Sequence, residues 1–123
     1  MNFLDSSIWL AHLLESNLQC SEIIESDVIL YSSILTLFEV KKKLIKENFD
    51  KEKIILSINF IKKRSMIINI NEEIINIAIN ISIKNNLSAI DSLIYASALK
   101  MKAKFITADN DFRNLEYAEV INK

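Results

Sequence analysis

The chain has 123 residues, half of them hydrophobic, and a formal net charge of −1 at pH 7, so we expect a single domain over residues 1–123 with enough apolar side chains for a core. It contains no glycine and no proline, which excludes the glycine-rich phosphate loops of Walker and Rossmann nucleotide-binding proteins. The nearly neutral charge also argues against a protein whose whole surface coats nucleic acid, although it leaves room for a local basic patch.

The first half of the chain predicts two buried strands, each followed by helical segments. Serine and aspartate recur just before the apolar-periodic stretches, where their side chains can cap the first turn of a helix. The helix after the second strand is expected to carry Leu35, Phe38 and Leu44 on its apolar side. The expected elements are a strand at 3–4, a helix capped by Ser6 or Ser7, a helical turn at 21–25, a strand at 28–31, a helix from Ser32 or Ser33 to about Glu47, and a helix from Asp50 to Arg64.

The second half continues the alternation of strands and helices. Asn71 followed by two glutamates is a good helix start, and Ser88 with Asp91 resembles a capping box. Alternation with little hairpin chemistry predicts an α/β domain with a mainly parallel sheet of four or five strands. The expected elements are a strand at 66–70, a helix from Asn71 to about Lys84, a helix from Ser88 to about Met101, a strand at 105–107, a helical turn at 111–115 and a strand at 119–121.

Without glycine, turns that require a positive φ must use another residue, and asparagine is the expected substitute. The sequence also predicts the cellular compartment of the protein. Charges or asparagines interrupt every apolar run, so we expect no membrane span. The single cysteine, Cys20, cannot form an intramolecular disulfide, and no basic stretch precedes the first strand, so we expect a cytoplasmic location. The asparagines expected in turns are Asn48, Asn85, Asn86 and Asn110.

Four acidic residues lie inside or at the end of apolar runs, where a carboxylate is costly to ionise unless a positive charge compensates it. Two of them, Asp5 and Asp109, follow strand ends, which meet at one edge of a parallel sheet. A bound Mg²⁺ or Mn²⁺ would compensate such a cluster and is suited to phosphodiester hydrolysis. The four, called here the acidic quartet, are Asp5, Glu39, Asp91 and Asp109.

Each member of the quartet also has a simpler local explanation. Asp5 and Asp91 can cap helices, Asp109 can begin a turn, and Glu39 can pair with Lys43 one helical turn later. Any one of these explanations is more common than a functional role. Together they leave unexplained why four acids each lie against apolar neighbours.

Other reaction chemistries fit the sequence less well. One histidine and one cysteine do not make a zinc cage. A Ser-His-Asp triad would depend on His12, which we expect to face solvent on an amphipathic helix. The run Asp5-Ser6-Ser7 lacks the adjacent acids of a receiver domain and the Asp-x-Asp of a haloacid-dehalogenase-type phosphatase.

The acidic quartet and its neighbouring residues resemble the motifs of the PIN-domain family. In length, the chain is most similar to the VapC-type toxins of that family. The matching stretches are Asp5–Ser7, Glu39, Asp91–Ala96 and Thr107–Phe112, and the resemblance covers essentially the whole chain. It implies a three-layer α/β/α PIN-like domain and a metal-dependent ribonuclease. The family often places a glycine before its last catalytic strand, where this chain has Lys102-Ala103-Lys104.

The resemblance also implies roles for individual residues. The acidic quartet would be both catalytic and metal-binding, with Mg²⁺ or Mn²⁺ as the cofactor. Supporting positions would be an additional acid and two hydroxyls that line the pocket: Asp111, Ser6 and Thr107.

The partners implied by the resemblance are an RNA substrate, a cognate antitoxin and a second copy of the chain. Lys41 to Lys43 could contact an RNA backbone, but a solvated helix face is the better explanation for at least two of them. Trp9 and Tyr95 could stack on bases, but aromatic residues at helical spacing more often belong to a core or an interface. The isoleucine-rich helices around Ile54 and Ile74 suggest surface left for a partner, with tight core packing as the alternative. A PIN-type module that binds RNA or assists assembly without catalysis remains the alternative function.

Overall fold

The computed structural model describes residues 1–122, and its centre is a five-stranded sheet in which every strand pairing is parallel. The first strand is the middle of the sheet. Within it, Leu4 lies opposite Ser32 on one side and Ile106 on the other, so three strand ends meet at one edge. The strands are β1 (Asn2–Leu4), β2 (Leu30–Ser33), β3 (Met66–Ile68), β4 (Lys104–Thr107) and β5 (Ala118–Val120), in the order β3-β2-β1-β4-β5.

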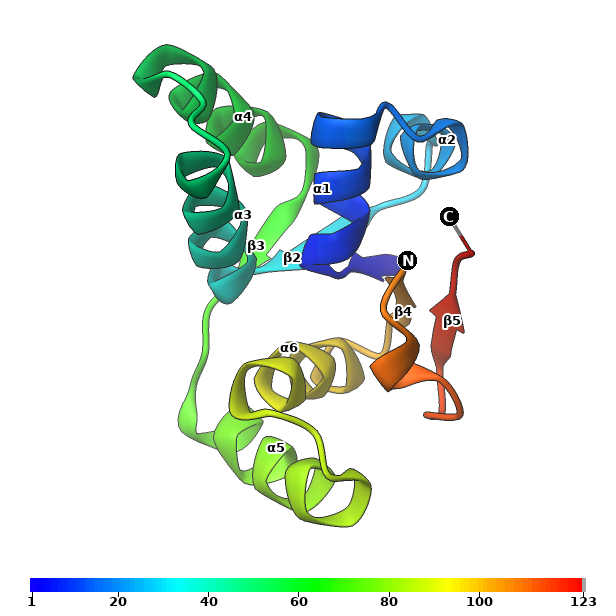
Figure 1. Cartoon of the computed structure of the whole chain (residues 1–123). Helices are drawn as coiled ribbons and strands as arrows, with labels where there is room; N and C mark the ends of the chain where they lie inside the picture. The colour runs from blue at the N-terminus through cyan, green and yellow to red at the C-terminus, as the bar shows by residue number, and fades with distance from the viewer. Residues whose placement is uncertain (123) are drawn as a thin grey trace.

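Helices cover both faces of the sheet and complete three layers (Figure 1). The predicted α/β/α class is therefore confirmed. One face carries the first four helices and the other carries the next two, and a short 3₁₀ helix, η1, follows β4. The helices are α1 (Ser6–Glu15), α2 (Leu18–Glu25), α3 (Ile34–Lys46), α4 (Lys51–Arg64), α5 (Glu72–Asn85), α6 (Ala89–Lys100) and η1 (Asn110–Phe112). Within residues 1–122 none of them combines the length and apolar character needed to cross a bilayer.

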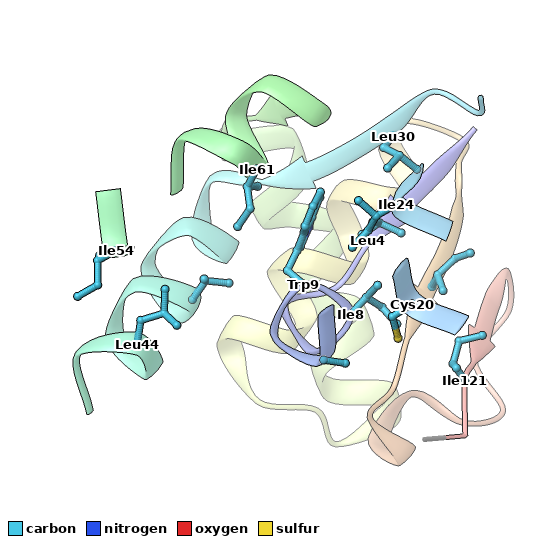
Figure 2. Close-up of a cluster of buried hydrophobic side chains, with 13 residues drawn as sticks. Leu4, Ile8, Trp9, Cys20, Ile24, Leu30, Leu44, Ile54, Ile61 and Ile121 are labelled. Carbon is cyan, nitrogen blue, oxygen red and sulfur yellow. The ribbon is translucent and has the colours of Figure 1, made fainter. Parts of the chain in front are cut away.

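Alternate residues of the strands feed two separate cores, as expected for a sheet covered on both sides. Leu4 and Ile106 pack toward α1 to α4 with Trp9 at the centre (Figure 2), and the Trp9 indole N–H donates a hydrogen bond to Ser32 Oγ at 3.0 Å. On the opposite face Phe105 packs with Tyr95 from α6. Trp9 and Tyr95 are therefore core residues, and the base-stacking role considered for them is wrong.

Positive φ angles occur at asparagines, as expected, but also at residues for which this backbone conformation costs more free energy. Asn48 and Asn86 have φ angles of 63° and 54°, whereas the prediction fails for Asn85 and Asn110, which lie in α5 and η1. Lys102, in the stretch where the family often has glycine, has a φ angle of 54°. A side chain in this left-handed conformation costs roughly 1–2 kcal/mol. The turn before β4 thus keeps the geometry that glycine favours without having a glycine.

Several element boundaries differ from the sequence-based expectation. The second helix begins at Leu18 instead of Ser21, because the Asn17 side chain accepts a hydrogen bond from Cys20 N at 3.0 Å and caps it earlier. The N-cap of α1 is Asp5, not a serine. Smaller shifts affect the second, third and fifth strands and the 3₁₀ helix, which span 30–33, 66–68, 118–120 and 110–112.

Candidate active site

The acidic quartet lines one cleft with a volume of about 390 Å³ at the edge where β1 and β4 end. Its members come from four separate segments: the end of β1, the second turn of α3, the first turn of α6 and the residues after β4. The cleft is also lined by serines, apolar side chains and lysines, namely Ser6, Ser7, Leu10, Phe38, Lys42, Lys43, Lys46 and Ile90.

Asp5 is held by two hydroxyl groups from opposite ends of the chain. Its side chain is 5% exposed, and its Oδ2 accepts hydrogen bonds from Ser7 Oγ at 2.8 Å and Thr107 Oγ1 at 2.7 Å. The same two hydroxyl oxygens accept backbone N–H groups from Ala108 at 2.8 Å and Asp109 at 3.0 Å. The two hydroxyl oxygens also lie 3.2 Å from each other, so Asp5, Ser7 and Thr107 form one hydrogen-bonded group. Although Asp5 is the N-cap residue of α1, its side chain makes no capping hydrogen bond.

Glu39 is positioned by a serine and not by a lysine. Its Oε1 accepts a hydrogen bond from Ser6 Oγ at 2.6 Å, and Ser6 Oγ also lies 3.2 Å from Thr36 Oγ1. Lys43 pairs with Glu47 at 3.1 Å, so the pairing of Glu39 with Lys43 considered from the sequence is wrong. Glu39 lines the cleft, and its carboxylate is oriented by Ser6, the first residue of the helix that follows β1.

Three aspartates form the tightest acidic group within residues 1–122. Asp91, Asp109 and Asp111 each offer a carboxylate oxygen, and these oxygens lie within 4.8 Å of one another. The local roles also exist: Asp91 N donates to Ser88 Oγ, and Asp109 Oδ1 accepts from Asp111 N at 2.9 Å. Hard divalent cations prefer carboxylate oxygen. Asp5 and Glu39 line the same cleft but lie outside this three-residue group.

Three carboxylates of the cleft, those of Asp5, Glu39 and Asp91, have raised pKa values. Burial raises the pKa of Asp5, and Glu39 adds to the rise against the hydrogen bonds from Thr107 and Ser7. Burial likewise raises the pKa of Glu39, with Asp91 and Asp109 adding to it. The pKa of Asp91 is raised by burial first and then by its acidic neighbours. A cation in the cleft would oppose these pKa rises, because a nearby positive charge favours the ionised form of a carboxylate.

Sequence reasoning missed or misplaced several residues around the cleft. Ser7 was missed, since only Ser6 of the two serines was expected among the hydroxyls that line the pocket. Phe38 was expected on the apolar side of its helix, yet its side chain is 58% exposed. His12 was expected to face solvent, but it is half-buried, with Nδ1 2.7 Å from Ser21 Oγ and its ring stacked on Phe60. Lys46 had no signal beyond helical spacing.

Comparison with known proteins gives a consistent result. A family model described as the PIN domain matches residues 3–116 of the chain. Among curated proteins, none matches the chain by sequence.

Solved structures with the same fold include several toxin–antitoxin proteins. A toxin–antitoxin complex from Klebsiella pneumoniae superposes with a TM-score of 0.79 at 20% identity, over 98% of this chain and 97% of that one. VapBC2 from Rickettsia felis, bound to a promoter DNA fragment, gives a TM-score of 0.79 at 16% identity over 98% and 97%. VapC20 from Mycobacterium tuberculosis, a toxin that cleaves the sarcin–ricin loop, gives 0.77 at 14% identity over 99% and 100%. At these identities the likeness establishes the fold.

Proposed function

Because the chain belongs to the PIN-domain family, we propose that it is a divalent-metal-dependent endoribonuclease and the toxin of a toxin–antitoxin pair. The observation that carries this proposal is the gathering of the acidic quartet, from segments far apart in the sequence, in one cleft at the carboxyl ends of parallel strands. Ligands of open parallel α/β sheets bind at that edge. The cleft has the acids that metal-assisted phosphodiester hydrolysis requires.

The donor set fits Mg²⁺ or Mn²⁺. Asp91, Asp109 and Asp111 present oxygen ligands at mutual distances compatible with one ion, and small hard cations prefer such ligands while keeping positions open for water and phosphate. When bound, the ion would lower the pKa of a water molecule and neutralise charge that develops on the phosphoryl group.

The residues would divide the work as follows. Asp91 and Asp109, with Asp111 assisting, would hold the ion, and Asp5 would join them in an orientation fixed by the hydroxyls of Ser7 and Thr107. Glu39, oriented by Ser6, would bind metal or orient the attacking water.

The partners follow from the same assignment. The toxin role calls for an antitoxin that covers the cleft or the surface beside it, and we expect the chain to pair with a second copy. Large apolar side chains remain exposed on both isoleucine-rich helices, which supports surface for protein contacts. The most exposed of them are Ile55 and Leu56 on α4 and Ile75, Ile79 and Ile83 on α5. An RNA substrate agrees with the expected cytoplasmic location.

A non-catalytic RNA-binding module is the second candidate, because three lysines line the same cleft as the acids and would hold a phosphate backbone with or without turnover. The two functions differ in one measurable property. The module would bind RNA in a metal-dependent way and release it intact.

The proposal is tested by RNA cleavage with Mg²⁺ or Mn²⁺ and with excess chelator, using the wild type, Asp5→Asn and Asp91→Asn. We expect cleavage by the wild type that stops with chelator and is lost in both variants. Asp27→Asn is the matched control, since it removes the same charge at an exposed position that does not line the cleft. Cleavage retained by both cleft variants would reject the assignment, and binding without cleavage by the wild type would favour the module.

A further inference from the structure

An exposed aromatic ring stands beside the acidic cleft. Phe38 precedes Glu39 on α3, lines the cleft with it, and leaves 58% of its side chain exposed. Helical periodicity places Phe38 with the apolar residues, but the fold turns it to the cleft wall instead. A phenylalanine with this exposure at the mouth of a polar cleft has a large apolar face available to a ligand.

Two lysines continue from Phe38 along the same helix. Phe38, Lys42 and Lys46 are spaced four residues apart, so they lie above one another on one face of α3 over roughly 12 Å, and all three line the cleft. Lys42 Nζ is 5.8 Å from the centre of the Phe38 ring. Lys43 also lines the cleft but pairs with Glu47. We call Phe38, Lys42 and Lys46 the α3 stripe.

The cleft is thus lined by side chains of opposite charge. We call Asp5, Asp91 and Asp109 the acidic wall and the α3 stripe the basic wall, and Glu39, on the same helix as the stripe, adds a fourth carboxylate to the lining. A single-stranded nucleic acid suits both walls, because its bases stack on aromatic rings and its phosphates pair with lysines. The acidic wall, once compensated by a cation, would take a phosphate of the same strand.

From this arrangement we propose that the α3 stripe is a nucleotide-binding subsite for single-stranded RNA, in which one base stacks on Phe38 while Lys42 and Lys46 contact the phosphates next to the one at the acids. The inference rests on the proposed function, since it assigns the RNA a path through the same cleft. It makes Phe38 a residue that sets where the strand lies, and the stacking would tolerate any base.

An acidic protein segment is the rival occupant of the stripe. Phe38 and the lysines also border a shallow groove with Lys41 and Ile45, which a peptide would fit. The position of the stripe favours RNA. A peptide carboxylate that reached the lysines would lie beside Glu39 and the other acids, and the peptide would have no phosphate for a cation to bridge to those acids. The stripe is continuous with the acids, and a phosphodiester strand is the ligand that uses both.

The test measures affinity for a short fluorescein-labelled single-stranded RNA by anisotropy, with Mg²⁺ and in an Asp91→Asn background so that the RNA stays intact. We expect Phe38→Ala to weaken binding about tenfold and Phe38→Leu to weaken it similarly, with Phe38→Trp restoring it. Lys42→Gln should lower the slope of log affinity against log salt by about 0.7, the value for one lost phosphate contact on a single strand.

Matched controls separate the subsite from general effects. Ile55→Ala removes an apolar side chain of equal exposure (59%) on α4, outside the cleft, and Lys63→Gln removes one exposed lysine there. Both should bind RNA like the parent. Phe38→Leu keeps an apolar side chain, so a comparison of melting temperatures shows whether the alanine variant acts through folding.

The outcomes are distinct. Equal RNA affinity of Phe38→Ala, Phe38→Leu and the parent overturns the subsite. Equal affinity together with lost self-association assigns Phe38 to a protein interface and also overturns it. If the Asp91→Asn background still cleaves the RNA, the role proposed for Asp91 fails, whereas the affinity series with intact RNA at low temperature still decides the subsite.

Discussion

Asp5 and Thr107 are joined by a hydrogen bond of 2.7 Å although they are 102 residues apart in the chain. The register of the sheet makes this possible, because Leu4 lies opposite Ile106 and the next residue of each strand reaches the same edge. Thr107 Oγ1 accepts the backbone N–H of Asp109 as well. A single hydroxyl therefore links two members of the acidic quartet, and its removal disturbs both.

Thr107→Val keeps the shape of a fully buried side chain but removes this hydroxyl. The buried Asp5 carboxylate loses a donor and the Asp109 amide loses its acceptor, so we expect the free energy of unfolding to fall by about 1–3 kcal/mol. Urea denaturation at neutral pH measures the change. Thr107→Ser keeps the hydroxyl and is the control; if it loses as much stability as the valine variant, the hydrogen bonds are not the cause.

Ser7→Ala should weaken metal binding more than it weakens the fold. Ser7 donates to Asp5 and receives the Ala108 amide, so it orients both the first acid and the segment that carries Asp109. Loss of a group that orients a metal ligand typically costs 10–100-fold in affinity, and we expect about tenfold for Mn²⁺. Calorimetric titration measures it, with Ser57→Ala on α4 as the control. Unchanged Mn²⁺ affinity would remove Ser7 from the site.

The metal-free protein should become less stable as the pH rises. Burial raises the pKa of Asp5, Glu39 and Asp91 in the folded state, so between their ordinary values near pH 4 and these raised values the folded chain binds more protons than the unfolded chain. The stability contributed by protonation is present at low pH and is lost as the pH rises through the raised pKa values.

The measurement is chemical denaturation with chelator over a pH series that starts near the ordinary carboxyl pKa of about 4 and rises from there. Asp5→Asn cannot ionise and should flatten the dependence, while Mn²⁺ should reverse it by favouring the ionised acids. A metal-free protein whose stability increases steadily over this range would contradict the expectation.

Lys102→Gly should stabilise the turn before β4. The lysine has a φ angle of 54°, and glycine removes the steric penalty of that conformation at the cost of a more flexible unfolded chain, so we expect a net gain of about 0.5–1 kcal/mol. Thermal or urea unfolding detects it. Lys100→Gly, at the last residue of α6, should instead destabilise, because it removes the ion pair of Lys100 with Glu73 and puts a poor helix former in the helix. A loss of stability in Lys102→Gly would show that the lysine side chain contributes more than its backbone costs.

Much of the architecture was predictable because local rules and the fold agree. Periodicity and capping residues gave five strands alternating with helices, and the resemblance to the PIN-domain family is confirmed by the match over residues 3–116. The approach of Asp5 and Asp109 followed from the rule that parallel strands end at one edge, whereas Glu39 and Asp91 lie in helices, where that rule does not place them. The roles assigned to the four acids are predictions.

What the sequence did not reveal depends on tertiary contacts. Nothing near Asp5 indicates that Ser7 will meet Ala108, because that contact exists only once β1 and β4 are paired. Phe38 satisfies the apolar period of its helix, and only the packing of α3 decides that it faces the cleft. The Asn17 cap was missed because it competes with Ser21, an equally good capping residue four positions later.

The central position of β1 has a consequence for synthesis of the protein. The first strand to leave the ribosome needs β4 as a neighbour, and its terminal carboxylate needs Thr107, so most of the polypeptide must emerge before these contacts form. A nascent chain truncated before residue 104 cannot hold Asp5 in place. The cleft would therefore assemble only after β4 has been synthesised, and the folding of its first acid must wait for a strand about a hundred residues later.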